Sequence, residues 1–325
     1  MGVIERYRDR LPVGPSTPSL TLGEGGTPLL RSERLSARLG VELFFKFEGA
    51  NPTGSFKDRG MAVAVAKAIE DGAQGIVCAS TGNTAASAAA YAARAGVPAV
   101  VLHPAGAIAA AKQAQARAVG ARVLEVRGSF DEALRSCQQL AGRSSYALVN
   151  SLNPNRIEGQ KTAAFEVIEQ LGRVPDVLAL PYGGGGNTCA YAQGFAEEDV
   201  QPRLIAAQAA ERAVTLASAI RISEPAHLGE VEELIAAGRV EVVTVPDDAI
   251  TDAWLEIASR EGIFCEPSSA VGLAALAQVE LEPGSTVVCV LTGHGLKDTA
   301  AVDVLTPATT VVDASVEAIL AEVGR

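Results

Sequence analysis

One lysine, Lys57, lies where an amine can do chemistry, at the boundary between a turn and a helix. It belongs to the run Asn-Pro-Thr-Gly-Ser-Phe-Lys-Asp-Arg-Gly (residues 51–60), and an apolar stretch with helical spacing follows over residues 61–69. The turn fixes the backbone and the helix start fixes the lysine stem, so the amine can form a Schiff base with an aldehyde cofactor. A surface lysine at a helix N-terminus would show the same pattern. Whether Lys57 binds a cofactor therefore depends on the other segments of the chain.

A second polar segment, Ala-Ser-Thr-Gly-Asn-Thr-Ala (residues 79–85), follows an apolar strand and opens a helix. Such a junction exposes free backbone N–H groups at the helix start, which favour an anion. Three hydroxyls and one amide add further donors, namely Ser80, Thr81, Thr84 and Asn83. An ordinary helix cap would contain the same residue types. The segment therefore indicates an anion site only in combination with the others.

Four consecutive glycines form the third segment, from Gly183 through Gly184 and Gly185 to Gly186, followed by Asn187. They lie between an apolar strand and a helix. Backbone without side chains lets several amides converge on one oxyanion, although it loses much conformational entropy on folding. The spacing is neither GxGxxG nor a Walker loop, so it does not indicate a dinucleotide or a triphosphate. A flexible linker would rarely lie between a strand and a helix in this way.

The fourth segment, Thr-Gly-His-Gly-Leu-Lys-Asp, begins at Thr292 and again ends a strand in a glycine-broken loop. His294, inside the loop, could act as a general base, but we favour a structural role in which it bridges the loop backbone.

Strands and helices must alternate for these loops to meet. The apolar pattern predicts strands over residues 75–79, 99–103, 122–126, 146–150, 176–180, 204–208, 240–245 and 286–291. It predicts helices over residues 60–70, 84–95, 109–119, 130–141, 159–171, 188–196, 249–261 and 267–279. Glycines are placed just past six helix ends, at positions 72, 96, 120, 142, 172 and 262. Continuous apolar strands between helices are typical of parallel sheets that are covered on both faces.

We therefore predict an α/β protein of two doubly wound lobes with mostly parallel sheets. Residues 47–150 would form the smaller lobe. Residues 1–46 and 151–325 would form the larger lobe with the glycine loop, and residues 150–156 would cross between the lobes.

The composition excludes several classes of function. The chain has 325 residues and a formal net charge of −11, with a pI near 4.9, which disfavours binding to nucleic acid or anionic membranes. Five cysteines without a CxxC pair and three scattered histidines predict neither a disulfide framework nor a metal site. No signal segment opens the sequence, and Arg94, Gly96 and Pro98 interrupt its longest apolar stretch. We expect a cytoplasmic protein.

Together the four segments resemble those of the fold-type II pyridoxal-phosphate enzymes. The resemblance implies that Lys57 holds pyridoxal 5'-phosphate as a Schiff base and that residues 183–187 bind its phosphate. It further implies that Asn83 binds the ring hydroxyl and that Thr292 faces the ring nitrogen. The substrate's amino-acid end would then meet Ser80, Thr81 and Thr84.

Three segments, residues 153–162, 262–270 and 292–298, resemble those of the threonine synthase family in particular, and the full resemblance covers about residues 23–298. It implies conversion of O-phospho-L-homoserine and water to L-threonine and phosphate, by a lyase that works as a homodimer. The substrate phosphate would be met by Lys112, Asn150, Ser151 and Arg156, with Thr84 nearby.

The chain departs from the pattern of that family at Gly26, Ser223 and Thr299, where Asn, Gly and Pro are expected. None of these is a core catalytic position, although Ser223 lies in a loop that could alter substrate fit. Two alternatives remain. One is a serine/threonine dehydratase of the same fold, and the other is a catalytically silent binding protein. A nicotinamide dehydrogenase is disfavoured because its glycine fingerprint is absent.

Overall fold

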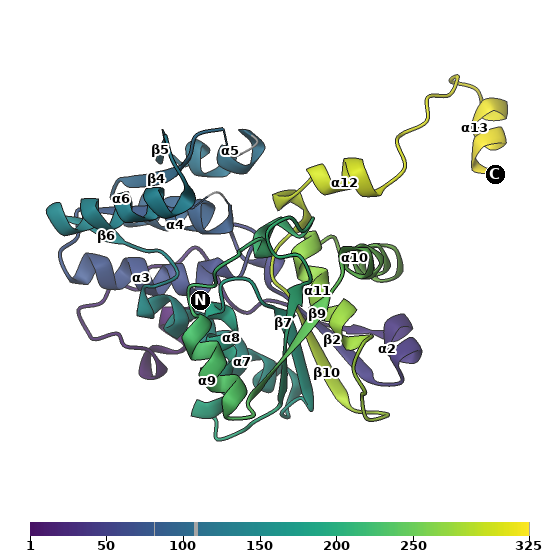
Figure 1. Cartoon of the computed structure of the whole chain (residues 1–325), viewed down its shortest axis with the longest axis horizontal. Helices are drawn as coiled ribbons and strands as arrows, with labels where there is room; N and C mark the ends of the chain where they lie inside the picture. The colour runs from purple at the N-terminus through teal and green to yellow at the C-terminus, as the bar shows by residue number, and fades with distance from the viewer. Residues whose placement is uncertain (81, 107–109, 325) are drawn as a thin grey trace.

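Two sheets built mainly from parallel strands organise the molecule (Figure 1). The computed structural model describes residues 1–80, 82–106 and 110–324, and of residues 110–112 it describes only the backbone. The six-stranded sheet has the order β1-β2-β10-β7-β8-β9 and the four-stranded sheet the order β5-β4-β3-β6. All neighbouring strands for which the register is given are parallel except β1 and β2. The predicted α/β class with mostly parallel sheets is confirmed.

The strands are β1 (Leu29–Ser32), β2 (Glu42–Phe47), β3 (Gly75–Ala79), β4 (Ala99–Pro104), β5 (Arg122–Val126), β6 (Tyr146–Leu148), β7 (Val177–Pro181), β8 (Arg203–Ala209), β9 (Val240–Val245) and β10 (Thr286–Leu291). The helices are α1 (Val3–Arg6), α2 (Glu33–Leu39), α3 (Lys57–Glu70), α4 (Asn83–Ala95), α5 (Ala110–Ala118), α6 (Phe130–Arg143), α7 (Pro154–Leu171), α8 (Gly186–Glu197), α9 (Leu228–Ala236), α10 (Asp247–Glu261), α11 (Pro267–Leu276), α12 (Ala300–Leu305) and α13 (Val316–Val323). Short 3-10 turns include η2 (Glu48–Ala50), η3 (Ser218–Ile220) and η4 (Gly295–Lys297).

Helices cover both faces of the larger sheet, as continuous apolar strands require. Side chains of α2, α10 and α11 share one apolar core with the sheet, and side chains of α7, α8 and α9 share another. Strands β3, β7 and β10 are buried along their whole length. The sequence pattern therefore located the central strands because nothing polar interrupts them.

Several predicted helix boundaries are wrong. The helix expected over residues 60–70 already begins at Lys57, and the one expected over residues 267–279 ends at Leu276. The helix expected from residue 159 begins at Pro154, because the Asn153 side chain caps it by accepting from the amide of Asn155 at 3.0 Å, and a proline suits the first helical position. Arg156, expected in a loop, therefore lies in the first turn of α7. Gly142 lies inside α6 rather than past its end, and open space surrounds the position of its missing side chain.

Helices α3 and α7 touch through glycines. A Cβ atom on Gly60 would overlap the carbonyl oxygen of Arg156, and one on Gly159 would overlap the carbonyl oxygen of Arg59. The helices therefore meet backbone to backbone, which brings the first turn of α3 against the first two turns of α7. Lys57 is the first residue of α3 and Arg156 the third of α7, so this contact sets their relative position.

Gly159→Ala is expected to lower the free energy of unfolding by about 1–3 kcal/mol, because a methyl group there must push the two backbones apart. Urea unfolding followed by circular dichroism would measure the change. Gly142→Ala is the matched control, since it adds the same atom to a helix in open space and should be neutral or stabilising by up to about 1 kcal/mol. Equal effects of the two substitutions would contradict the close contact.

A fully buried ionic cluster lies beside this crossing. The Arg59 guanidinium donates to Glu48 at 2.7 Å and to Glu166 at 2.6 Å, and the Lys46 amine donates to Glu166 at 2.8 Å. Burial alone would raise the pKa of both carboxyls, but Arg59 outweighs it and holds the pKa values of Glu48 and Glu166 below their usual range. The cluster joins β2 and η2 to α3 and α7. The amide of Gly26, one of the departures from the family pattern, also donates to Glu166 at 2.7 Å.

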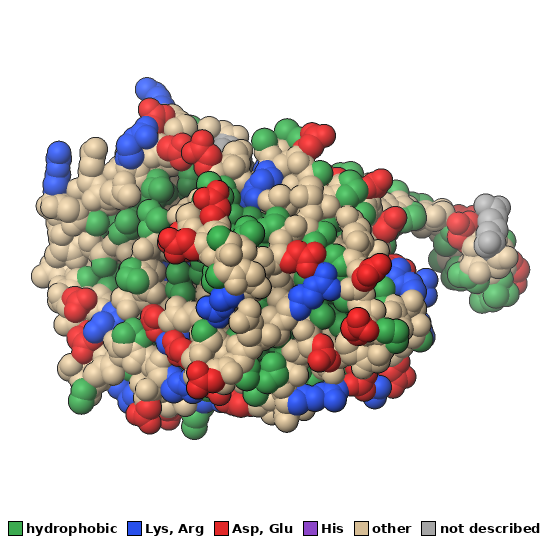
Figure 2. Space-filling view, turned by 60° about the horizontal axis from the view of Figure 1, so that its bottom comes forward, with side chains coloured by type: hydrophobic (Ala, Val, Ile, Leu, Met, Phe, Trp, Pro, Cys, Tyr) green, Lys and Arg blue, Asp and Glu red, His purple; other side chains and the backbone are tan. Residues whose placement is uncertain are grey.

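The last helix stands away from the rest of the molecule. Val302 and Leu305 of α12 still pack against the core of the larger sheet, and beyond them the chain extends to α13 at the yellow end in Figure 1. In Figure 2 hydrophobic side chains gather on this protruding segment, while acidic and basic side chains are interspersed over the body. Among its apolar residues, Val311 is 95% exposed and Val323 is 73% exposed. This segment takes no part in the site described below.

Candidate active site

Three of the four predicted loops meet through hydrogen bonds. The amide of Phe56, next to Lys57, donates to the carbonyl oxygen of Thr292 at 3.0 Å, and the amide of His294 donates to Gly54 at 2.9 Å. The Asn83 side chain reaches the same region through Glu266, whose own amide donates to the Gly293 carbonyl at 3.0 Å. The lysine, asparagine and threonine loops therefore form one contiguous site.

The amine of Lys57 is suited to act as a nucleophile. Burial, followed by the nearby Arg156 guanidinium, lowers the pKa of Lys57 to about 7, and the Glu266 carboxylate opposes this only in part. Its nitrogen lies 4.4 Å from the centre of the Phe56 ring. Because only the neutral amine attacks a carbonyl carbon, a lowered pKa leaves a large reactive fraction near neutral pH.

Asp58 ties the lysine loop to the asparagine helix. Its carboxylate accepts from the Thr53 hydroxyl at 2.6 Å, from the Thr53 amide at 2.7 Å and from the Ser87 hydroxyl on α4 at 2.6 Å. Lys57 and Asn83, at the starts of α3 and α4, therefore have a fixed relative position. Sequence analysis quoted Asp58 in the lysine run without giving it a role.

Glu266 is a second residue that the sequence analysis did not assign. The Asn83 amide nitrogen lies 3.2 Å from both of its carboxylate oxygens, and the residue is only 3% exposed. Burial raises the pKa of Glu266. This contact uses the donor side of the Asn83 amide and leaves its oxygen available to a ligand. The sequence did contain a signal for this residue, because Glu266 lies in segment 262–270, which resembles the threonine synthase family.

The glycine loop engages its carbonyl groups and leaves its amides available. The Gly183 carbonyl accepts from the Arg212 side chain, the Gly184 carbonyl accepts from the amide of His227 at 3.0 Å, and the Gly185 carbonyl accepts from the amide of Cys189 at 3.0 Å. Within the described chain, no acceptor is recorded for the amides of residues 183–188. Gly185 has φ +88°, which favours glycine. The loop could thus hold an anion at the N-terminus of α8.

Two side chains of the same loop lack partners. The Asn187 amide nitrogen and the Thr188 hydroxyl are both buried, and neither has a hydrogen-bond partner among the described residues. Buried donors without partners are rare in native proteins and indicate a missing ligand or water. The loop therefore fits the phosphate of pyridoxal phosphate, and Lys57 fits its aldehyde.

Thr292 follows β10 and is buried. Its hydroxyl lies 3.1 Å from the Ser269 hydroxyl, which also accepts from the amide of Gly293 at 3.0 Å. A neutral hydroxyl at this place is compatible with a pyridine nitrogen. His294 accepts from the amide of Leu296 at 3.1 Å and so caps η4, in agreement with the predicted structural role.

Arg156 is a buried cation without a carboxylate partner in the part of the chain that the structure describes. One guanidinium nitrogen donates to the Val149 carbonyl at 2.8 Å, while Nε has no partner among the described atoms. Burial lowers the pKa of Arg156 to about 10. A buried, uncompensated guanidinium beside the Lys57 amine is a strong site for a bound anion.

The remaining predicted substrate residues differ in their surroundings. The Asn150 amide is already bound to the backbone of Ala79, to the amide at 2.9 Å and to the carbonyl at 2.8 Å. The Ser80 hydroxyl accepts from the amides of Gly82 and Ala85, both at 3.2 Å. Thr84 lies in the first turn of α4 and is partly buried. Thr81 and the side chain of Lys112 lie outside the described residues.

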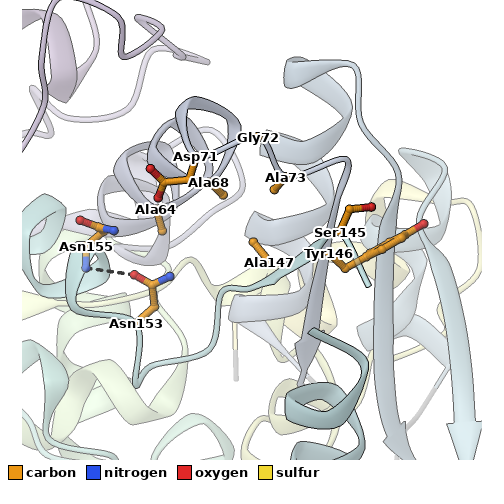
Figure 3. A pocket seen from close by; sticks show the side chains of 10 residues that line it. All are labelled: Ala64, Ala68, Asp71, Gly72, Ala73, Ser145, Tyr146, Ala147, Asn153 and Asn155. Carbon is orange, nitrogen blue, oxygen red and sulfur yellow. Dashed lines mark hydrogen bonds between the residues drawn. The ribbon is translucent and has the colours of Figure 1, made fainter. Parts of the chain in front are cut away.

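One cavity of the described residues lies away from this site. It has a volume of about 290 Å³ and lies between the end of α3, the start of β6 and the start of α7. Figure 3 shows it lined by small side chains together with Tyr146, Asn153 and Asn155. Asp71, on its rim, follows the last residue of α3, about 21 Å along that helix from Lys57.

Neither a membrane span nor a metal site is evident in the structure. Across the described ranges, every helix is too short or too polar to cross a bilayer. The same residues contain no group of three or more His, Cys, Asp or Glu side chains that could hold a metal ion.

The sequence is similar to those of known pyridoxal-phosphate dependent enzymes. A family model described as pyridoxal-phosphate dependent enzyme matches residues 20–293. The threonine synthase of Halalkalibacterium halodurans is 48% identical over 91% of this chain and 90% of its own length. That of Mycobacterium tuberculosis is 46% identical over 91% and 89%, and that of Methanocaldococcus jannaschii is 44% identical over 90% and 80%.

Solved structures share the fold at lower identity. Maize serine racemase superposes with a TM-score of 0.79 at 23% identity, covering 94% of this chain and 97% of its own. The processed form of threonine deaminase isoform 2 from Solanum lycopersicum gives a TM-score of 0.76 at 24% identity, covering 86% and 82%.

Proposed function

Because this chain belongs to the pyridoxal-phosphate dependent enzymes, in the group of the threonine synthases, we propose that its convergent loops act together in one reaction. The reaction is the conversion of O-phospho-L-homoserine and water to L-threonine and phosphate, with pyridoxal 5'-phosphate as cofactor. One observation carries the assignment of roles. The Lys57 amine, partly buried and with a lowered pKa, lies close to the buried Arg156 guanidinium, which lacks an anionic partner among the described residues.

The cofactor would be held at four points. Lys57 would bind its aldehyde, the amides and side chains of residues 183–188 its phosphate, Asn83 its ring hydroxyl, and Thr292 its ring nitrogen. Bound pyridoxal phosphate supplies an electron sink for the charge left when C–H bonds of the substrate break. A neutral hydroxyl opposite the ring nitrogen would leave that nitrogen largely unprotonated.

Proton transfer would belong to Lys57. When it is not bound to the cofactor, the Lys57 amine could accept the proton from the substrate α-carbon and then move the β-proton. A pKa of about 7 suits an amine that must both take and give protons near neutral pH. Phosphate then leaves from the γ-carbon, and water adds at the β-carbon.

The substrate would be held by its two anionic ends. Ser80, Thr81 and Thr84 would bind the carboxylate together with the free amides at the start of α4. The phosphate would meet Arg156 first, with Ser151 and Lys112 beside it. For Asn150, whose amide is bound to Ala79, we propose that the remaining N–H of its Nδ2 donates to this phosphate group.

Product analysis of the purified enzyme tests this proposal. Supplied with O-phospho-L-homoserine, it should release phosphate and threonine in equal amounts and show the visible absorbance of a lysine-bound cofactor. Serine and threonine should give little 2-oxo acid. A yellow protein that releases no phosphate but forms 2-oxo acid from threonine would instead be a dehydratase.

Arg156→Ala is expected to raise the KM for O-phospho-L-homoserine by about 10–100-fold, since a charge-assisted hydrogen bond contributes about 1.5–3 kcal/mol. Steady-state kinetics and the inhibition constant of inorganic phosphate would measure it. Arg173→Ala, which removes an exposed arginine paired with Glu42, is the control and should change neither value. Unchanged KM and kcat in Arg156→Ala would remove this residue from the site.

We further propose that the enzyme is a cytoplasmic homodimer and that its lobes divide at residues 47–150 against 1–46 and 151–325. The free cysteines suit a reducing compartment, since Cys78, Cys137, Cys265 and Cys289 are buried and none is disulfide-bonded. The four-stranded sheet lies wholly inside the smaller lobe so defined. Analytical ultracentrifugation would test the oligomeric state.

A further inference from the structure

One buried histidine contacts both of the proposed phosphate-binding regions. His227 lies just before α9, and its backbone amide donates to the carbonyl of Gly184 in the glycine loop at 3.0 Å. Its ring nitrogen Nε2 lies 3.0 Å from the carbonyl oxygen of Ser151, which shortly precedes α7 and Arg156. A carbonyl can only accept, so Nε2 donates. The residue is 4% exposed.

His227 also packs against two glycines, through its Cβ at Gly185 and through its ring at Gly186. A Cβ atom on Gly185 would lie 3.0 Å from the Cβ of His227, and one on Gly186 would lie 3.3 Å from its Cδ2. His227 therefore packs directly against the backbone of the glycine loop. Glycine at these positions is needed for this approach as well as for the anion.

The second ring nitrogen faces solvent-exposed charge. Nδ1 lies 3.1 Å from a carboxylate oxygen of Glu230, whose side chain is 58% exposed. A contact with so exposed a carboxylate contributes little to fixing the ring. The buried contact with Ser151 is therefore the one that determines where the ring lies.

We propose that His227 is a positioning residue that sets the spacing between the cofactor phosphate and the substrate phosphate. It joins the glycine loop, which would hold the cofactor phosphate, to residues 150–156, which would hold the substrate phosphate. The two segments, residues 150–156 and the glycine loop from Gly183, are 27 residues apart in sequence at their nearest, and His227 connects them by one hydrogen bond on each side. This inference rests on the proposed function, because it takes the glycine loop and residues 150–156 as the two phosphate sites.

Isosteric substitutions separate the two ring nitrogens. His227→Gln places an amide donor where Nε2 lies, and His227→Asn places one where Nδ1 lies. His227→Asn should raise the KM for O-phospho-L-homoserine about tenfold and weaken cofactor binding several-fold, with kcat changed less than about threefold, because one buried hydrogen bond is lost. His227→Gln should stay within about threefold of the unaltered enzyme, and Glu230→Gln should change KM less than about twofold.

The measurements are the dissociation constant of pyridoxal phosphate, titrated into cofactor-free enzyme by absorbance, and the kinetic constants of the reconstituted enzyme. The first needs no substrate, so enzyme that binds cofactor but releases no phosphate would refute the proposed function and still report on the glycine loop. Should His227→Asn fail to fold, His227→Phe keeps the packing against Gly185 and Gly186 without the hydrogen bond, and should show the same loss.

Three outcomes would overturn the inference. The first is unaltered KM and cofactor affinity in both His227→Asn and His227→Phe. The second is an equal loss in His227→Gln and His227→Asn, which would indicate packing alone. The third is a loss in Glu230→Gln as large as in His227→Asn, which would assign the effect to the exposed contact with Glu230.

Discussion

Lys57→Ala enzyme should fold and still bind phosphate, but turn over O-phospho-L-homoserine more than about 10⁴-fold more slowly than the unaltered enzyme. The substitution removes both the amine that binds the cofactor aldehyde and the base that moves the substrate protons, and each role contributes a large factor. No hydrogen bond of this side chain contributes to its pKa, so its loss leaves no buried partner unsatisfied among the described residues. Phosphate release and thermal unfolding on the same preparation would measure both effects.

Lys67→Ala is the matched control, because Lys67 lies on the same helix and pairs at the surface with Glu70. It should keep full activity. Measurable steady turnover in Lys57→Ala would refute the assignment.

The lowered pKa of Lys57, about 7, also predicts how the rate of cofactor binding depends on pH. Because the neutral amine attacks, capture of pyridoxal phosphate by cofactor-free enzyme should speed up from about pH 6 to about pH 8 and then level off.

Arg59→Met should lower the free energy of unfolding by about 3–5 kcal/mol at pH 7, since it leaves two buried carboxylates with Lys46 as their only remaining buried cation among the described residues. Methionine fills much of the same volume, so the loss would report on charge rather than on a cavity. Chemical denaturation followed by tryptophan fluorescence would measure it through Trp254. Arg173→Met, which breaks an exposed pair, should change stability by less than about 0.5 kcal/mol.

The pH dependence of this loss has a definite sign. In the unaltered protein the pKa values of Glu48 and Glu166 are lowered, so their stabilising contribution is present above the unfolded value and is lost as the pH falls below it. Without Arg59, burial dominates and raises both pKa values. Both carboxyls then take up protons in the folded state as the pH falls. The difference between variant and unaltered protein should therefore narrow from about pH 7 to about pH 5, and a difference that widens would contradict this account.

The sequence predicted those parts of the site that depend on local pattern. Lys57, Asn83, Thr292 and the four glycines each follow a strand or open a helix, and parallel strands bring such ends to one edge of a sheet. The fold class could be predicted from the uninterrupted apolar strands, because these are also a local pattern. What was predicted correctly was encoded in short runs of neighbouring residues.

The supporting residues could not be predicted because their contacts cross long stretches of chain. Glu266 accepts a hydrogen bond from Asn83, which is 183 residues away in sequence. Arg212 donates to the carbonyl of Gly183, which is 29 residues away. His227 donates to the carbonyl of Ser151, which is 76 residues away. Each is a charged or polar residue in an ordinary local setting, so no period or turn signal marks it. The commitment of the Asn150 amide to Ala79 was equally invisible, since it depends on the register of β3 against β6.

The glycine contact between α3 and α7 bears on how this enzyme can change over evolutionary time. The helix starts that carry Lys57 and Arg156 meet through main-chain atoms at Gly60 and Gly159. A side chain at either glycine would force the two backbones apart, so both positions constrain how this site can evolve. Substrate changes that keep this contact would fall in the loops around Ser80, Ser151 and His227, where side chains make the contacts.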